Sequence, residues 1–226
     1  EVHFNGTIEE NWTENGLEIK HKDYNTVIAV PYDMPIIGYK TKTPVTLRLW
    51  SARSKQRFDL HSFNEGIYDK AMADQTFAEA ISKVLYPSDD HMQGKQLRLK
   101  QFYFLASATM QSMLKRHKQI FSDLHTLPDH VVIQINETHP ALAIPELMRI
   151  LMDEEGFGWD EAYQIVKKMF HYTNHTIMTE AMEYWDENMF RFLLPRFYQI
   201  VCAFNEKYCN KIRAYYSHDE EKVRSM

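Results

Sequence analysis

The second half of the sequence contains the order strand, polar loop, helix twice, and this order restricts the fold more than any other feature. Residues 131–135 are a short, largely β-branched run typical of a buried parallel strand, followed by polar residues 136–140 and a helical pattern through Met152. Residues 172–176 begin a second unit that leads into a helix near Thr179. Such units form a parallel sheet with right-handed crossovers, and ligands bind off the carboxyl ends of its strands. The sequence therefore predicts an α/β fold whose two polar loops face one ligand.

The first fifty residues have the pattern of β-structure. The pair Asn15-Gly16 is the strongest short signal for a hairpin turn. We expect two further strands, over residues 26–30 and 45–50, with a loop at 33–38 between them. The chain therefore opens with a β-rich segment.

Helical periodicity replaces this pattern further along the chain. We expect helices over residues 68–84, 96–121 and 159–169, and a helical C-terminal third that Pro195 divides in two. Residues 218–222 are expected to form a charged surface tail.

Composition and charge exclude several classes of partner. The formal charge is −5 and the pI is near 6.1, so the chain lacks the basic excess that nucleic acids and anionic membranes require. Cys202 and Cys209 lie about 10 Å apart along a predicted helix, beyond the reach of a disulfide. No apolar run approaches the ~18 residues of a membrane span. We therefore expect a cytoplasmic protein with a neutral ligand.

The two polar loops hold the first candidate site residues. Asn136, Glu137, Thr138 and His139 follow the first strand, and Asn174, His175 and Thr176 end the second. These side chains could bind the hydroxyl groups of a sugar. Helix capping is the competing interpretation, because Thr138 precedes Pro140 at a helix start.

Acidic residues and histidines near the second loop allow other interpretations. Glu180 and Glu183 could pair with Glu137 as in a retaining glycosidase, although first-turn acids stabilised by a helix dipole explain them equally well. His171 and His175 have the spacing of a metal-binding pair, but no H-E-x-x-H glutamate accompanies them, so we expect no metal.

Asp89-Asp90-His91 lie between Pro87 and Gly94. Composition fits both a simple turn and a mobile gate over a site.

Long words of this sequence resemble the α-glucan phosphorylase family across nearly the whole chain. They are VIAVPYDMPIIGY (27–39), TLRLWSA (46–52), ISKVLYPSDD (81–90), GKQLRLKQFYFLASATMQ (94–111), QINETHPALAIPELMRIL (134–151), YTNHTIMTEAMEYW (172–185) and LLPRFYQI (193–200). The resemblance implies part of the N-terminal Rossmann-like domain of a two-domain GT-B glycosyltransferase. Residues 1–52 would be its β-rich segment and residues 53–226 its α/β and helical segment.

The implied reaction is phosphorolysis of an α-1,4-glucan by inorganic phosphate to give glucose 1-phosphate, in an enzyme that forms homodimers. Pyridoxal phosphate assists this reaction in the family through its phosphate group. The lysine that holds the cofactor belongs to the second domain, so we expect no cofactor-binding residue in this chain and no activity from it alone.

The resemblance also implies roles for individual residues. His175 matches the histidine that contacts the transferred glucosyl ring, and Glu137 stands where the family usually has an aspartate that supports this histidine. Asp89 and Asp90 match a gate loop on the substrate side, although the family more often has Asp-Asn followed by an aromatic residue.

Arg48, Lys115 and Arg116 fall where some members bind the phosphate of a nucleotide effector. Solvated basic ends of a strand and a helix explain these three residues equally well.

Two alternatives compete with the enzyme interpretation. One is a carbohydrate-binding or oligomerisation module without catalysis, and the other is a retaining hydrolase that uses a carboxylate pair.

Overall fold

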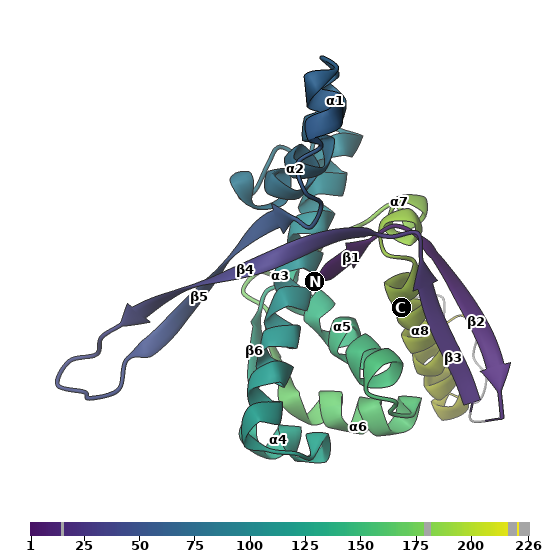
Figure 1. The fold of residues 1–226 in the computed structure, drawn as a ribbon. Helices are drawn as coiled ribbons and strands as arrows, with labels where there is room; N and C mark the ends of the chain where they lie inside the picture. Colours follow the sequence, from purple (N-terminus) through teal and green to yellow (C-terminus); the bar gives the residue numbers. More distant parts are fainter. Residues whose placement is uncertain (15, 179–181, 217–220, 222–226) are drawn as a thin grey trace.

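The computed structural model describes residues 1–14, 16–178, 182–216 and 221. A helical body carries three separate β-structures, and one of them projects far from it as a long hairpin (Figure 1). The architecture is mixed α/β with a β-rich N-terminal segment, as the sequence predicts. Within the described ranges, no helix is both long and apolar enough to cross a bilayer.

The first sheet is antiparallel and has the order β1 (Val2–Phe4), β4 (Asn25–Ile36), β5 (Val45–Ser54). The expected loop at 33–38 is wrong for residues 33–36, because β4 continues through Pro31 and Pro35 to Ile36. Beyond Val27, β4 pairs with β5 alone, so one edge of it is free. A proline at a free edge removes no ladder hydrogen bond, which explains why both prolines are tolerated.

The predicted N-terminal hairpin is confirmed. Strands β2 (Thr7–Thr13) and β3 (Gly16–Lys22) are antiparallel and pair Thr13 with Gly16 across the turn. The ribbon stands beside the C-terminal helix (Figure 1), where Gln199 Nε2 donates to Glu10 Oε1 at 2.9 Å.

The helices of the described residues are α1 (Leu60–Asn64), α2 (Tyr68–Lys83), α3 (Met92–Ile120), α4 (Leu127–His130), α5 (Ala143–Arg149), α6 (Trp159–Met169), α7 (Glu187–Leu193) and α8 (Pro195–Tyr215), with short 3-10 helices η1 (Leu124–Thr126) and η2 (His139–Leu142) and a π-helical segment η3 (Ile150–Glu154). Helices α2, α3 and α6 lie close to their predicted positions. The break at Pro195 is confirmed, whereas the sequence pattern missed α1 and α4.

Helix α3 begins four residues before its predicted start because His91 caps it. The His91 Nδ1 atom accepts a hydrogen bond from the Gly94 backbone N–H at 2.9 Å. A Cβ atom on Gly94 would lie 1.9 Å from the carbonyl oxygen of Ser88, so this close approach requires glycine.

Strands β6 (Ile133–Asn136) and β7 (Phe170–Thr173) form the predicted parallel pair, with Ile133 opposite Phe170 and Asn136 opposite Thr173. Strand β7 starts and ends earlier than the predicted 172–176, so Asn174 to Thr176 follow the strand rather than end it.

The helix expected near Thr179 is wrong where the structure can test it. Residues 182–186 have no regular helix, and α7 begins at Glu187 because the Asp186 side chain caps it by accepting from the Met189 N–H at 2.8 Å. Thr179, Glu180 and most of the predicted tail lie outside the described residues.

Helix α3 is the common support of two hydrophobic cores. Its Met110 and Leu114 join residues of α5, α6 and α8 in the first core. Its Leu99 and Phe104 join β1, β4, α2 and α7 in the second. The β-rich segment and the β6–β7 pair are therefore fixed to one helix.

A buried ion pair within α5 is hydrogen-bonded to α3. Glu146 is 0% exposed, and its carboxylate accepts two hydrogen bonds from Arg149, both at 2.9 Å. It also accepts from Tyr103 Oη at 3.0 Å and Ser107 Oγ at 2.6 Å. Burial opposes the charged form of Arg149, but Glu146 outweighs this effect and raises the pKa of Arg149 above its usual value. All partners are satisfied, which is the condition for a buried pair to be tolerated.

Replacing Glu146 by Ala should lower the free energy of unfolding by about 3 kcal/mol, because Arg149 then stays buried without its main partner. Urea denaturation measures the change. Glu154→Ala is the matched control, since Glu154 contacts the same arginine but is half exposed, and it should cost less than about 1 kcal/mol. Equal losses in the two variants would contradict the role given to burial.

His3 should make stability depend on pH. Burial, aided by Arg149, lowers the pKa of His3 from 6.5 to about 4. Between about pH 6.5 and about pH 4, His3 is protonated in the unfolded chain but not in the folded chain. The free energy of unfolding therefore falls as the pH decreases through this window. Urea midpoints at several pH values should show a smaller decrease in His3→Asn than in the wild type. An unchanged slope would refute this assignment.

Candidate functional site

The site is built at the carboxyl ends of β6 and β7. Backbone pairing continues past the strands, because the Glu137 N–H donates to the Thr173 carbonyl at 3.1 Å. Below it, Gln134 Nε2 donates to Thr173 Oγ1 at 2.6 Å. The loops that leave the two strands therefore start side by side, as the sequence predicts.

Glu137 turns the chain sharply and reaches across to the second loop. Its φ is +63°, in the left-handed region that non-glycine residues seldom adopt. Its carboxylate Oε1 accepts a hydrogen bond of 2.5 Å from the backbone N–H of His175. The structure thus brings Glu137 and His175 together, and the contact is made to the peptide group of the histidine rather than to its imidazole.

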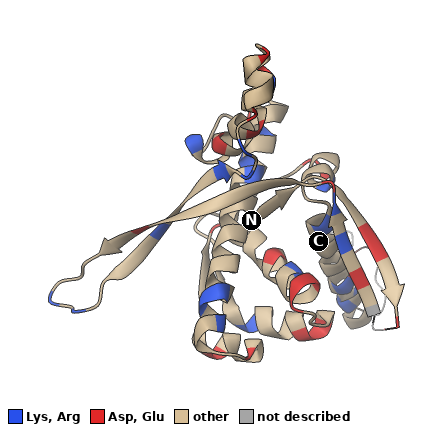
Figure 2. Ribbon diagram, viewed as in Figure 1, with Lys and Arg blue, Asp and Glu red and all other residues tan. Residues whose placement is uncertain are grey.

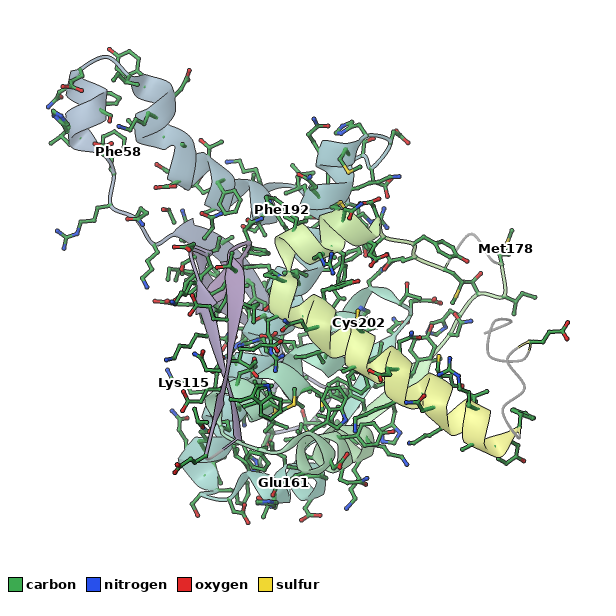
Figure 3. The ribbon with its side chains drawn as sticks, turned by 90° about the vertical axis from the view of Figure 1, so that its right-hand side faces the viewer. Phe58, Lys115, Glu161, Met178, Phe192 and Cys202 are labelled. Carbon is green, nitrogen blue, oxygen red and sulfur yellow. The ribbon has the colours of Figure 1, made fainter. Side chains whose placement is uncertain are left out.

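Asn174 and Thr176 form a compact turn around His175. Asn174 Nδ2 donates to the Thr176 carbonyl at 2.5 Å, and the Thr176 N–H donates back to Asn174 Oδ1 at 3.5 Å. Asn174 and His175 are exposed and Thr176 is half-buried. Met178, two residues after Thr176, lies at the periphery of the molecule (Figure 3). The turn therefore leaves His175 exposed to solvent.

His139 belongs to a second group of contacts. Its Nδ1 atom lies 2.8 Å from Glu183 Oε1, and its ring stacks on Phe102 with centroids 4.9 Å apart and planes at 19°. Thr138, by contrast, makes no capping hydrogen bond at the start of η2, and its buried hydroxyl has no partner among the described residues. The capping interpretation therefore fails for Thr138.

The residues of the 89–91 loop have separate partners. Asp89 Oδ2 accepts from Arg98 at 2.8 Å, whereas Asp90 Oδ2 accepts from Ser88 Oγ at 2.8 Å. Arg98 also approaches Glu183 at 3.8 Å, so Asp89 is joined to the His139 group through one arginine. Asp90 makes no such connection among the described residues.

A pocket of about 440 Å³ opens beside this group. Its polar lining includes Asn136, His139 and Gln134, and Tyr86 and Phe102 contribute aromatic walls. Convergent polar groups on an apolar wall are typical of ligand sites. Glu137, His175 and Asp89 lie outside the lining of this pocket.

The sequence pattern did not indicate a role for Arg98 and Phe102 at the site, and it offered Glu183 only as a helix-dipole residue or as a member of a carboxylate pair. The spacing of Arg98 and Phe102, four residues apart, indicates a shared helix face. Nothing in the sequence pattern indicates that Glu183 contacts that face, because the described residues near it, 174–178 and 182–186, form no helix or strand.

Comparison with known proteins decides the family. The model of the carbohydrate phosphorylase family matches residues 1–226. This chain belongs to the carbohydrate phosphorylase family. It is 46% identical to the brain form of glycogen phosphorylase of Bos taurus and of Homo sapiens and to the liver form of Ovis aries, in each case over 100% of the chain. The chain spans 27% of the length of these relatives.

The family implies pyridoxal phosphate, and the expectation that this chain contributes no cofactor-binding residue stays a prediction. An aldehyde cofactor needs a lysine amine, and no lysine lines the pocket beside His139. Lys100 has a lowered pKa because of burial, but its amine sits 4.5 Å over the Phe77 ring of α2, in the other core. We therefore derive no chemical step through the cofactor.

Arg48, Lys115 and Arg116 line one surface hollow of this phosphorylase chain. Basic residues colour the lower end of α3 blue, whereas most of the β4–β5 hairpin is uncharged (Figure 2). Arg48 binds both carboxylate oxygens of Asp33, at 2.7 and 2.6 Å, and this pairing lowers the pKa of Asp33. Arg48 is thus neutralised, which leaves the effector role of the three residues a prediction.

The expectation that His171 and His175 bind no metal remains a prediction. Among the described residues, no cluster of three or more histidine, cysteine or acidic side chains has a geometry suited to a metal ion.

Replacing Glu137 by Ala should free the His175 amide. We expect its hydrogen exchange, measured by NMR, to accelerate by about tenfold or more, because its acceptor is lost. Glu137→Gln keeps an acceptor oxygen at the same distance along the side chain and should preserve most of the protection. If Ala and Gln have the same effect, the hydrogen bond does not organise this loop.

Proposed function

We propose that the chain is part of an α-glucan phosphorylase and carries the sugar-binding side of its active site. The observation that supports the proposal best is the junction of the two loops, in which the carboxylate of Glu137 binds the backbone amide of His175. Family membership over residues 1–226 supports the same conclusion.

In the proposed reaction, inorganic phosphate removes the terminal glucose of an α-1,4-glucan as glucose 1-phosphate. Positive charge develops on the ring carbon of the leaving glucosyl unit, and fixed dipoles near that carbon stabilise it. His175 is the residue we place against the glucosyl ring. Glu137 holds the peptide of His175 in place, and a fixed orientation is what makes such a dipole effective.

Hydroxyl groups of the sugar would be bound by the polar residues around this point. We assign this role to Asn174, Thr176 and His139, and we propose that Asp89 and Asp90 lie on the substrate side of the loop that follows α2. Arg48, Lys115 and Arg116 form our proposed effector site, away from the sugar.

We further propose that the whole enzyme has the two-domain GT-B architecture, acts in the cytoplasm and forms homodimers. Residues 1–226 would belong to its N-terminal domain. Pyridoxal phosphate would be attached to a lysine outside this chain and would supply a phosphate group for proton transfer.

An oligomerisation module without catalysis is the second candidate, because large apolar side chains stand exposed on the projecting elements. Ile37 is 81% and Tyr39 87% exposed at the end of the β4–β5 hairpin. Phe58, which precedes α1 (Figure 3), is exposed, as are Leu60 of α1 and Tyr68 of α2. Apolar surface of this kind marks contact with further polypeptide. This candidate predicts an assembly of the chain with itself and no glucan turnover in any context.

A chimera tests the catalytic proposal. The chain should replace the matching 27% of the Bos taurus brain form and sustain glucose 1-phosphate formation from maltoheptaose and phosphate. His175→Ala should lower the rate about 10²-fold or more, because the group against the glucosyl ring is lost. His171→Ala is the matched control on β7 and should stay within a few-fold of the parent chimera. Equal rates for the two variants would contradict the assignment of His175.

The chain by itself provides the baseline of the same assay. We expect it to form neither glucose 1-phosphate nor free glucose. Release of free glucose from maltoheptaose would instead support the retaining hydrolase.

A further inference from the structure

Glu183 lies between two nitrogen groups that come from different parts of the chain. Its Oε1 atom is 2.8 Å from His139 Nδ1 and 3.8 Å from an Arg98 terminal nitrogen. The Glu183 side chain is only 19% exposed. Glutamate side chains ordinarily carry a negative charge at neutral pH.

An ionised carboxylate can only accept hydrogen bonds, so the contact fixes the proton on the imidazole. Nδ1 of His139 must carry the hydrogen that Glu183 accepts. The other ring nitrogen, Nε2, is then unprotonated in the neutral side chain and offers a lone pair. No described residue makes a hydrogen bond to Nε2. His139 also lines the pocket of about 440 Å³.

The ring plane of His139 is fixed as well as its proton. The imidazole stacks on Phe102, and the Arg98 guanidinium lies 5.5 Å from the centre of the same phenyl ring. Arg98 and Phe102 are four residues apart on α3 and therefore share a face of that helix. A second bond from Arg98 to Asp89 holds the arginine in position.

We propose that Glu183 is a positioning residue that, with Arg98, holds neutral His139 as its Nδ1–H tautomer so that Nε2 accepts a hydrogen bond from a sugar hydroxyl. The identity of the ligand rests on the proposed function, whereas the tautomer does not. In this arrangement the Glu183 carboxylate is occupied by its hydrogen bond with His139, so it is not the second member of a hydrolytic carboxylate pair.

The tautomer can be read directly in the purified chain. Long-range ¹H–¹⁵N correlation spectra, recorded well above the pKa of a free imidazole, distinguish the protonated ring nitrogen from the bare one. His139→Gln identifies the signals of His139. We expect a protonated Nδ1 and a bare Nε2 in the wild type. In Glu183→Ala the pattern should reverse toward the Nε2–H form that predominates in a histidine without partners.

Two further variants separate positioning from folding. Glu183→Gln keeps an acceptor oxygen between His139 and Arg98, and since both neighbours are donors the amide oxygen should face them and preserve the Nδ1–H form. Glu187→Ala removes a carboxylate on α7 that contacts Tyr198 instead, so it should leave His139 unchanged. Unchanged signals from the other histidines show that each variant is folded.

A wild-type His139 in the Nε2–H form would overturn the proposal, as would a Glu183→Ala chain whose His139 tautomer equals that of the wild type. Retention of the Nδ1–H form in Glu183→Gln, with its loss in Glu183→Ala, would support it. These spectra report on His139 alone. A failure of the proposed function would be seen separately, as loss of glucose 1-phosphate formation in the chimera.

Discussion

Parallel pairing of β6 with β7 is the constraint on which the candidate site depends. Two parallel strands cannot be joined by a tight turn, so η2, α5, η3 and α6 must carry the chain from the end of one strand to the start of the next. A pair of strands is marginal by itself, and the packing of the crossover helices against α3 supplies the missing stability. Because the strands are parallel, both loops leave the sheet at the same edge, and Glu137 can reach the backbone of His175.

Helix α3 connects this sheet to the rest of the chain because its neighbouring faces contact different parts of the structure. Tyr103 and Ser107 point to the buried Glu146 of α5 and fix the crossover. Arg98 and Phe102 contact the groups around His139. Each pair is spaced by four residues, so each forms one patch on the helix surface. A shift of α3 that disturbed the buried ion pair would therefore also move the wall of the pocket.

The sequence predicted the elements with strong periodicity and missed features that depend on distant contacts. Helix α6 and the parallel pair follow from local pattern. The extension of β4 through two prolines does not, since it depends on which edge β5 leaves free. The start of α7 was misplaced because the acidic residues before it resemble a first helical turn, whereas Asp186 provides the cap. At the site, the loops were predicted from their positions after strands, but the roles of Arg98 and Glu183 require the tertiary fold.

The carboxylates around the site differ in what they can do chemically. A retaining hydrolase needs one carboxyl group as nucleophile and another as acid, both facing the sugar without competing partners. Here the Glu137 carboxylate accepts a backbone N–H and the Glu183 carboxylate is shared by His139 and Arg98. Carboxylates with such partners orient other groups, and their oxygens are not free to face the sugar. This arrangement agrees with the proposed phosphorolysis, in which the nucleophile is inorganic phosphate rather than a carboxylate of the chain.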